Sequence, residues 1–177
     1  GPELLGGASC DPMVPSHCGF PFPSNVYLVT DASTPSGKRV AFGADTLPSH
    51  PTKGHIPPAI VAESDGFSPG QAPMTDMPGA TVTGLPTQHT IDASISPDSP
   101  TILLDAETGQ LIPHFAELDM NGEPGDRALL LRPVVRIPDE HRIIVAIRNV
   151  VDDTNKPLAP SPVFQALRDG TASTEPS

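Results

Sequence analysis

Proline and glycine interrupt this chain more often than they interrupt an ordinary globular domain. The sequence holds 24 prolines and 15 glycines among 177 residues. A proline inside a helix removes a backbone hydrogen bond and clashes with the preceding turn, so the long helices of a bundle are excluded. Short strands separated by turns suit the same spacing. We therefore expect an all-β fold.

Length and charge limit the class of protein further. A chain of 177 residues is long enough for one hydrophobic core. Acidic residues outnumber basic residues by 21 to 10, a formal net charge of -11, so a nucleic-acid partner is not expected. No apolar stretch approaches the roughly 18 to 20 residues that a membrane span needs, so membrane insertion is not expected either.

The two cysteines, Cys10 and Cys18, lie in one proline-containing loop with seven residues between them. A zinc site normally needs four ligands in paired short spacings, and a redox pair needs the Cys-x-x-Cys spacing. This spacing favours a small disulfide, with two free thiols as the alternative. A disulfide forms in an oxidising compartment, so we expect a secreted protein that is extracellular or at the cell surface.

Apolar runs and turn residues alternate through the first part of the chain. Residues 26–30 and 39–43 flank a Pro-Ser-Gly turn at 35–37, which predicts a hairpin. Residues 44–58 are rich in proline, which interrupts both strand ladders and helices. We expect this segment to form an extended surface arm.

The strand pattern is clearer in the second half. Residues 101–106 and 110–118 flank a turn at 107–109, which predicts a second hairpin. Further strands are expected at 128–132 and 142–148, with weaker candidates at 72–77 and 81–83. The β-branched run within 142–148 is expected to be buried on both faces.

One short helix is expected near the end of the chain. Ser161 suits the N-cap, Pro162 the first helical position and Gly170 the position after the last turn, with residues 163–168 between them. Strands at intervals of about ten residues with this one C-terminal helix favour an immunoglobulin-like antiparallel β-sandwich with long proline-rich loops.

The expected layout has three parts. Residues 1–9 form an N-terminal linker, and residues 10–170 form the β-sandwich domain with its disulfide-closed loop and the arm at 44–58. The polar residues 171–177 form a C-terminal tail.

One short motif suggests a catalytic serine, but the residue that follows this serine cannot supply the hydrogen bond that catalysis needs. Residues 66–70 (GFSPG) match the G-x-S-x-G pattern of the hydrolase nucleophile elbow, with Ser68 as the nucleophile. The elbow uses the backbone N–H of the next residue as an oxyanion donor, and Pro69 has none. We expect a turn here and assign no catalytic residue.

Two groups of residues are candidate metal ligands. His50 and His55 are five apart and the other histidines are scattered, so exposed loop histidines are favoured over a metal site. Asp119, Asn121, Glu123 and Asp126 supply oxygen ligands around a glycine turn, a fragment of a calcium loop. An acidic hairpin turn is favoured, and calcium at these four residues is the alternative. No other cofactor is expected.

Several short stretches also occur in a recognisable order. They are Cys10-Asp-Pro with Cys18, then 21–25 (PFPSN), 65–70 (DGFSPG), 104–109 (LDAETG), 117–119 (ELD), 131–133 (LRP) and 141–148 (HRIIVAIR). Together they resemble the N-terminal region of large secreted bacterial proteins similar to the virulence-factor lipases, over most of residues 10–170. In that family an immunoglobulin-like β-sandwich precedes further modules, often including an α/β-hydrolase domain that carries the catalytic serine.

The resemblance implies a non-catalytic module that positions, or packs against, a downstream hydrolase domain or another protein subunit. The parent protein would then be a lipase or esterase, with no catalytic residue in this chain. The alternative is a structural or adhesion subunit of a cell-surface assembly, in which the arm at 44–58 lies on a neighbouring subunit.

Overall fold

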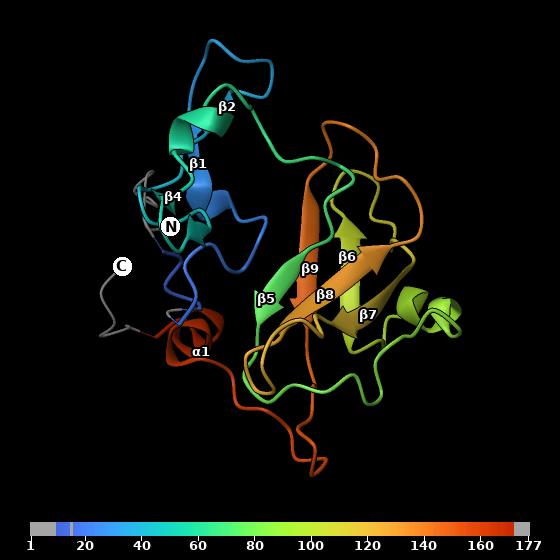
Figure 1. Cartoon of the computed structure of the whole chain (residues 1–177). Helices are drawn as coiled ribbons and strands as arrows, with labels where there is room; N and C mark the ends of the chain where they lie inside the picture. Colours follow the sequence, from blue (N-terminus) through green and yellow to red (C-terminus); the bar gives the residue numbers. More distant parts are fainter. Residues whose placement is uncertain (1–9, 15, 172–177) are drawn as a thin grey trace. The chain divides into compact units, whose positions relative to one another are not determined.

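The computed structural model describes residues 10–14 and 16–171. The chain divides into two compact units. Unit 1 comprises Gly1–Ser68 and Pro160–Ser177, and unit 2 comprises Pro69–Ala159. Figure 1 shows the elements of both. The sequence predicts one domain over residues 10–170. The expected linker at 1–9 and residues 172–177 of the expected tail lie outside the described residues.

Short antiparallel strands make up most of the regular structure in the described part of the chain, together with one short α-helix. The predicted all-β class is therefore confirmed, whereas the immunoglobulin-like sandwich stays a prediction. Within the residues that the structure describes, no helix has the length and apolar character needed to cross a bilayer.

Unit 1 contains the predicted hairpin. Strands β1 (Leu28–Thr30) and β2 (Lys38–Val40) pair antiparallel. The Asp31 N–H donates to the Gly37 carbonyl at 3.0 Å, which closes the turn between the strands. Gly37 has a φ of 69°, a left-handed conformation that glycine adopts without the steric cost of a Cβ.

The arm at 44–58 is exposed over most of its length. It also contains a very short hairpin that the sequence did not predict, with β3 (Ser49–His50) paired antiparallel to β4 (Gly54–His55). Unit 1 also holds two 3₁₀ helices: η1 (Asn25–Tyr27) directly precedes β1, and η2 (Pro58–Val61) begins at the last residue of the arm.

The single α-helix, α1 (Pro162–Asp169), has the predicted ends. The Ser161 hydroxyl accepts a hydrogen bond from the Phe164 N–H at 3.3 Å, which satisfies one of the unpaired donors of the first turn. Gly170 caps the other end with a φ of 65°. Val163 and Ala166 are the buried residues of this short amphipathic helix.

Unit 2 holds two sheets. One has the order β5-β8-β7, formed by β5 (Met74–Asp76), β8 (Ala128–Pro133) and β7 (His114–Leu118), and the other pairs β6 (Thr101–Asp105) with β9 (Ile143–Ile147). Figure 1 labels these strands. The 3₁₀ helix η3 (Ile91–Ile95) precedes β6. The predicted strand at 72–77 is therefore present as β5, whereas residues 81–83 form no strand.

One apolar core serves both sheets of unit 2. Its buried members are Leu85, Leu103, Ile112, Ala116, Leu129, Leu131, Ile137 and Val150. In β8 the buried residues Leu129 and Leu131 alternate with more exposed neighbours, the period of two that a strand with one core-facing side requires. Each fully buried leucine contributes about 1.5 to 3 kcal/mol to folding.

The predicted hairpin of 101–106 with 110–118 is wrong in its second half. The turn closes with the Ile112 N–H donating to the Leu103 carbonyl at 2.8 Å, but Pro113 follows and has no N–H to continue the ladder. The Pro113 carbonyl instead accepts from the Val134 N–H at 3.0 Å. The chain thus passes to the other sheet, where β7 pairs with β8.

The prediction for the last strand is also wrong in one respect. β9 is a strand, but it is not buried on both faces, because Ile144 is 42% exposed and Val145 is 40% exposed. Ile143 and Ile147 pack against the core while Ala146 is exposed. A run of apolar residues does not distinguish a central strand from an edge strand, and β9 pairs on one side only, with β6.

Candidate functional site

A fully buried histidine lies at the centre of a polar network in unit 2. His114, Thr101 and Ser94 all have 0% relative exposure. The Thr101 hydroxyl lies 2.9 Å from His114 Nε2, and His114 Nδ1 lies 2.9 Å from the Ile112 carbonyl oxygen. The His114 backbone N–H donates to the Ser94 hydroxyl at 2.9 Å, and that hydroxyl donates to the Ile91 carbonyl at 2.7 Å.

These contacts fix the protonation of the His114 ring. The Ile112 carbonyl can only accept, so Nδ1 carries the proton and Nε2 accepts from the Thr101 hydroxyl. Burial lowers the pKa of His114 and outweighs the opposing hydrogen bonds, which favours the neutral ring. Both ring nitrogens are occupied inside the core, so the His114 ring joins β7 to β6.

The prediction of exposed loop histidines is wrong for His114, which is fully buried. The alternation of Ile112, His114 and Ala116 is the signal that identifies it as a core residue, since all three are buried. Pro113 interrupts the run and obscures that alternation.

A second polar pair, Asp105 with His141, lies at the end of β6. His141 Nδ1 lies 2.8 Å from Asp105 Oδ2, with the two side chains 25% and 7% exposed. Asp105 Oδ1 accepts from the backbone N–H groups of Glu107 at 2.9 Å and Thr108 at 3.3 Å. The same carboxylate therefore closes the turn after β6 and holds His141. Sequence reasoning missed this pair because only the β6–β9 register brings the two residues together.

The environment of Asp105 favours its charged form. Burial raises the pKa of Asp105, but the hydrogen bonds from His141, Glu107 and Thr108 lower it more, so that the pKa lies below its ordinary value. The ionised carboxylate is therefore part of the folded structure.

Acid is expected to weaken this turn through Asp105. Because its folded-state pKa lies below 3.8, the carboxylate stabilises the fold fully above that pH and loses its contribution as pH falls through the lowered pKa. We expect Asp105→Asn to melt below the wild type at neutral pH, and the gap to narrow under acid conditions below about pH 4. Thermal scans over this range measure the gap, with exposed Asp153→Asn as control. A gap that stays constant down to the lowest pH would contradict the assignment.

An aspartate that orients a histidine is also one part of a hydrolytic triad, and the third part is a hydroxyl or thiol nucleophile. Within the described residues of unit 2, no serine, threonine or cysteine side chain is hydrogen-bonded to His141 Nε2. The pair can hold and orient an imidazole, but this structure supplies it with no nucleophile.

Unit 1 has its own buried polar centre at Tyr27, which is 0% exposed. The Tyr27 hydroxyl accepts from the backbone N–H groups of Asp11 and Gly19, each at 3.1 Å. Asp11 in turn accepts from the Ser24 hydroxyl at 2.9 Å. Burial raises the pKa of Tyr27 and so favours the neutral phenol. Tyr27 thereby anchors both sides of the cysteine loop.

The cysteine loop is closed as the spacing predicts, since Cys10 and Cys18 form a disulfide. Next to this loop in the chain, Phe20-Pro21 and Phe22-Pro23 are cis peptide bonds. The Phe22 ring lies 5.4 Å from the Phe67 ring, centroid to centroid, in an edge-to-face contact. The Tyr27 ring lies 5.0 Å from the Phe42 ring. These aromatic contacts form the apolar side of unit 1.

The GFSPG motif does not form a nucleophile elbow in the described chain. Ser68 is exposed, and residues 66–70 run from a bend through irregular backbone to a turn, with no strand leading in and no α-helix leading out. The strand-turn-helix frame that exposes a catalytic serine is therefore absent around Ser68.

The predicted calcium residues lie in an exposed turn between β7 and β8. Asp119 Oδ1 accepts from the Asn121 backbone N–H at 3.0 Å and from its side-chain Nδ2 at 2.9 Å. The Asp126 N–H donates to the Glu123 carbonyl at 2.9 Å. The structure thus joins Asp119 to Asn121 through side chains and Glu123 to Asp126 through the backbone. Calcium binding at these four residues stays a prediction.

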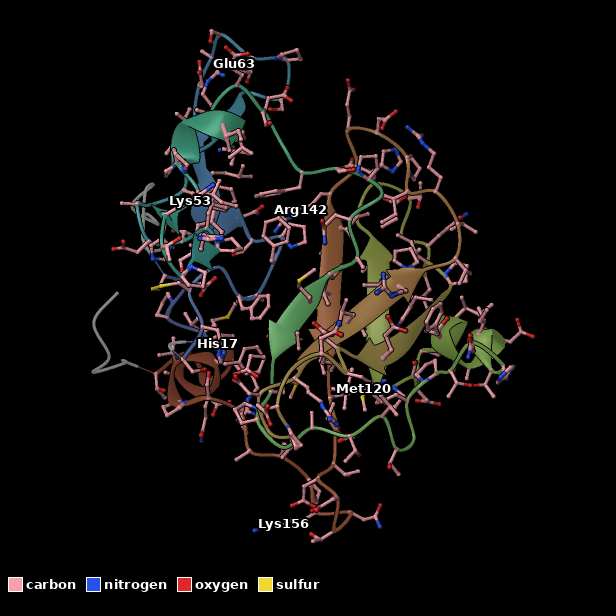
Figure 2. The ribbon with its side chains drawn as sticks, in the orientation of Figure 1. His17, Lys53, Glu63, Met120, Arg142 and Lys156 are labelled. Atoms are coloured by element: carbon pink, nitrogen blue, oxygen red, sulfur yellow. A yellow bond between two sulfur atoms is a disulfide. The ribbon has the colours of Figure 1, made fainter. Side chains whose placement is uncertain are left out.

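A pocket of about 400 Å³ adjoins this turn. Its lining includes the ion pair between Arg132 and Glu117 and the side chain of Met120, which is 67% exposed. Figure 2 labels Met120 at this turn. Both side chains of this ion pair are exposed to solvent.

The two arm histidines bond within their own hairpin. His55 Nδ1 lies 2.6 Å from the Leu47 carbonyl oxygen, and His50 Nδ1 accepts from the Thr52 N–H at 3.2 Å. Both residues are exposed, as the sequence analysis favoured.

Comparison with known proteins does not place the chain in a family. No protein-family model matches it, and neither the curated proteins nor the solved structures contain a significant match.

Proposed function

We propose that this chain is a non-catalytic extracellular module with an immunoglobulin-like sandwich. In this proposal it is the N-terminal part of a larger secreted bacterial protein of the lipase or esterase type, where it positions, or packs against, a hydrolase domain or another partner. The type of parent protein is inferred from the sequence resemblance. The antiparallel strands and the disulfide of the structure are consistent with such a module.

One observation carries the non-catalytic part of the proposal. Several buried polar side chains are hydrogen-bonded to the turns and strands that they hold in place: Tyr27 holds the cysteine loop in unit 1, and His114 joins β7 to β6 in unit 2. The Asp105–His141 pair has the geometry of a catalytic pair, but the described residues of unit 2 provide it with no nucleophile. Groups committed to the fold in this way are typical of a scaffold.

The disulfide supports the extracellular part. Disulfides persist in oxidising compartments and are reduced in the cytosol, so the Cys10–Cys18 bond points to an oxidising environment.

Hydrolysis of p-nitrophenyl butyrate by the purified chain tests the proposal. We expect a rate no higher than that of free imidazole at the concentration of the six histidines in the chain. We also expect Ser68→Ala and His141→Ala to leave that rate unchanged. Saturable hydrolysis that disappears in either variant would replace the scaffold with a small esterase.

A further inference from the structure

β9 is an open sheet edge, and its free backbone groups can be identified from the register. Ala106 donates to the Arg142 carbonyl, and Arg148 donates to the Pro100 carbonyl, at 2.9 and 2.8 Å. In an antiparallel ladder the hydrogen-bonded pairs alternate, so Ile144 and Ala146 bond inward to β6. The N–H and C=O groups of Ile143, Val145 and Ile147 consequently point away from β6.

The outer sides of two other strands in unit 2, β7 and β6, are covered. The outer side of β7 is met by Pro86, whose carbonyl accepts from the Ala116 N–H at 2.8 Å. The outer side of β6 is met by the returning turn, through Asp105 to Gln110 and Ile112 to Leu103. Among the described residues, no backbone hydrogen bond meets the outer side of β9. Natural proteins usually cover or blunt such an edge, so an open one suggests a pairing partner.

Side chains at this edge combine apolar surface with an unpaired cation. Ile144 is 42% exposed and Val145 is 40% exposed. Arg142, marked in Figure 2 beside the start of β9, is exposed. It is the one arginine in the described chain whose guanidinium makes no ion pair and no hydrogen bond. The chain as a whole has a net charge of -11, so an arginine without a partner inside the chain is unusual. Its free positive charge favours an acidic binding partner at this edge.

We infer that the open edge of β9 binds an extended, apolar strand of a partner protein that carries a carboxylate next to Arg142. The strand adds to the sheet antiparallel, with its backbone paired to Ile143, Val145 and Ile147. Arg142 and Ile144 then occupy the non-hydrogen-bonded positions, where cross-strand side chains approach most closely. The carboxylate therefore belongs near the carboxyl end of the bound strand.

A second copy of this chain fits the edge less well. Full antiparallel overlap of two β9 strands pairs Val145 with its own copy and places Arg142 opposite Arg148 at both ends. Like charges directly opposite one another destabilise a sheet. In an acidic strand from another protein, a carboxylate lies opposite Arg142 instead, and this pair of opposite charges is favourable.

This inference rests on the proposed function, because it names the chemistry of the partner against which the module packs. Its test measures strand binding and involves no hydrolysis. Failure of strand binding would therefore leave the non-catalytic assignment intact, and ester hydrolysis would leave the strand site intact.

The test uses a synthetic peptide of about seven residues that alternates threonine and valine and ends in glutamate. Amide hydrogen exchange is followed in the full chain with and without peptide. We expect the amides of Ile143, Val145 and Ile147 to exchange at least about tenfold more slowly with peptide, and those of Ile144 and Ala146 to change little. The same peptide ending in lysine is expected to bind about fivefold more weakly.

Two variants separate the contribution of backbone pairing to peptide binding from the contribution of the Arg142 charge. Val145→Pro removes an outward N–H without removing a bond to β6, and it should abolish peptide binding while β9 remains folded. Arg142→Glu should reverse the preference toward the lysine peptide, whereas the matched control Arg136→Glu should not. Unchanged exchange at the outward amides would overturn the inference, as would equal binding of the two peptides. Protection that appears without peptide and rises with protein concentration would assign the edge to a second copy and overturn it too.

Discussion

Replacing His114 with alanine is expected to lower the free energy of unfolding by about 3 to 5 kcal/mol. The substitution opens a cavity at a fully buried site and leaves the Thr101 hydroxyl and the Ile112 carbonyl without their partner. An unpaired buried polar group costs about 1 to 3 kcal/mol in addition to the lost packing. Urea denaturation at neutral pH followed by circular dichroism measures the change.

The exposed His89 provides the matched control for this experiment. His89→Ala should shift the free energy of unfolding by no more than about 0.5 kcal/mol, the range for surface substitutions. If His114→Ala were as mild as the control, the hydrogen-bonded histidine would not be what joins β7 to β6.

The second large effect is expected at Tyr27 in unit 1. Tyr27→Ala removes a fully buried aromatic ring and should cost about 3 to 5 kcal/mol. Tyr27→Phe keeps the ring but removes the acceptor for the Asp11 and Gly19 N–H groups, and should cost about 1 to 3 kcal/mol. Thermal and urea unfolding of both variants give the two values.

The exposed Phe164 on α1 is the control in the same unit, and Phe164→Ala should cost under about 1 kcal/mol. A Tyr27→Phe variant as stable as the wild type would contradict the role of the hydroxyl. The ring alone would then account for the burial of Tyr27.

Local sequence chemistry was enough to predict the elements that depend on neighbours in the chain. The ends of α1 follow from Ser161 and Gly170, and the first hairpin follows from the turn that ends at Gly37. The Cys10–Cys18 disulfide follows from a spacing that suits little else. In each case the deciding interaction spans only a few residues.

Features that depend on pairing between distant strands were not predictable in the same way. Pro113 passes the chain from one sheet to the other, and the sequence shows the proline without showing where the strand goes next. The Asp105–His141 contact joins residues 36 apart and exists only because β6 pairs with β9 in one register. The exposure of Ile144 likewise depends on which strand lies beside β9.

Buried polar side chains recur in both units with the same physical role. The Tyr27 hydroxyl gathers two backbone donors, and the His114 ring bridges a hydroxyl and a carbonyl. Loops rich in proline and glycine form few ladder hydrogen bonds, so side chains satisfy more of the backbone than they do in a regular sheet. Residue types associated with catalysis here serve to hold loops in place.

Labelling with a fluorophosphonate, which reacts with activated serines, tests most directly the proposal that this chain is not catalytic. Intact-mass spectrometry of the native chain after prolonged exposure should show no adduct, while a serine esterase treated alongside is fully labelled. One adduct per chain that maps to a single serine, and that is lost when the chain is unfolded before labelling, would show reactive machinery and contradict the account.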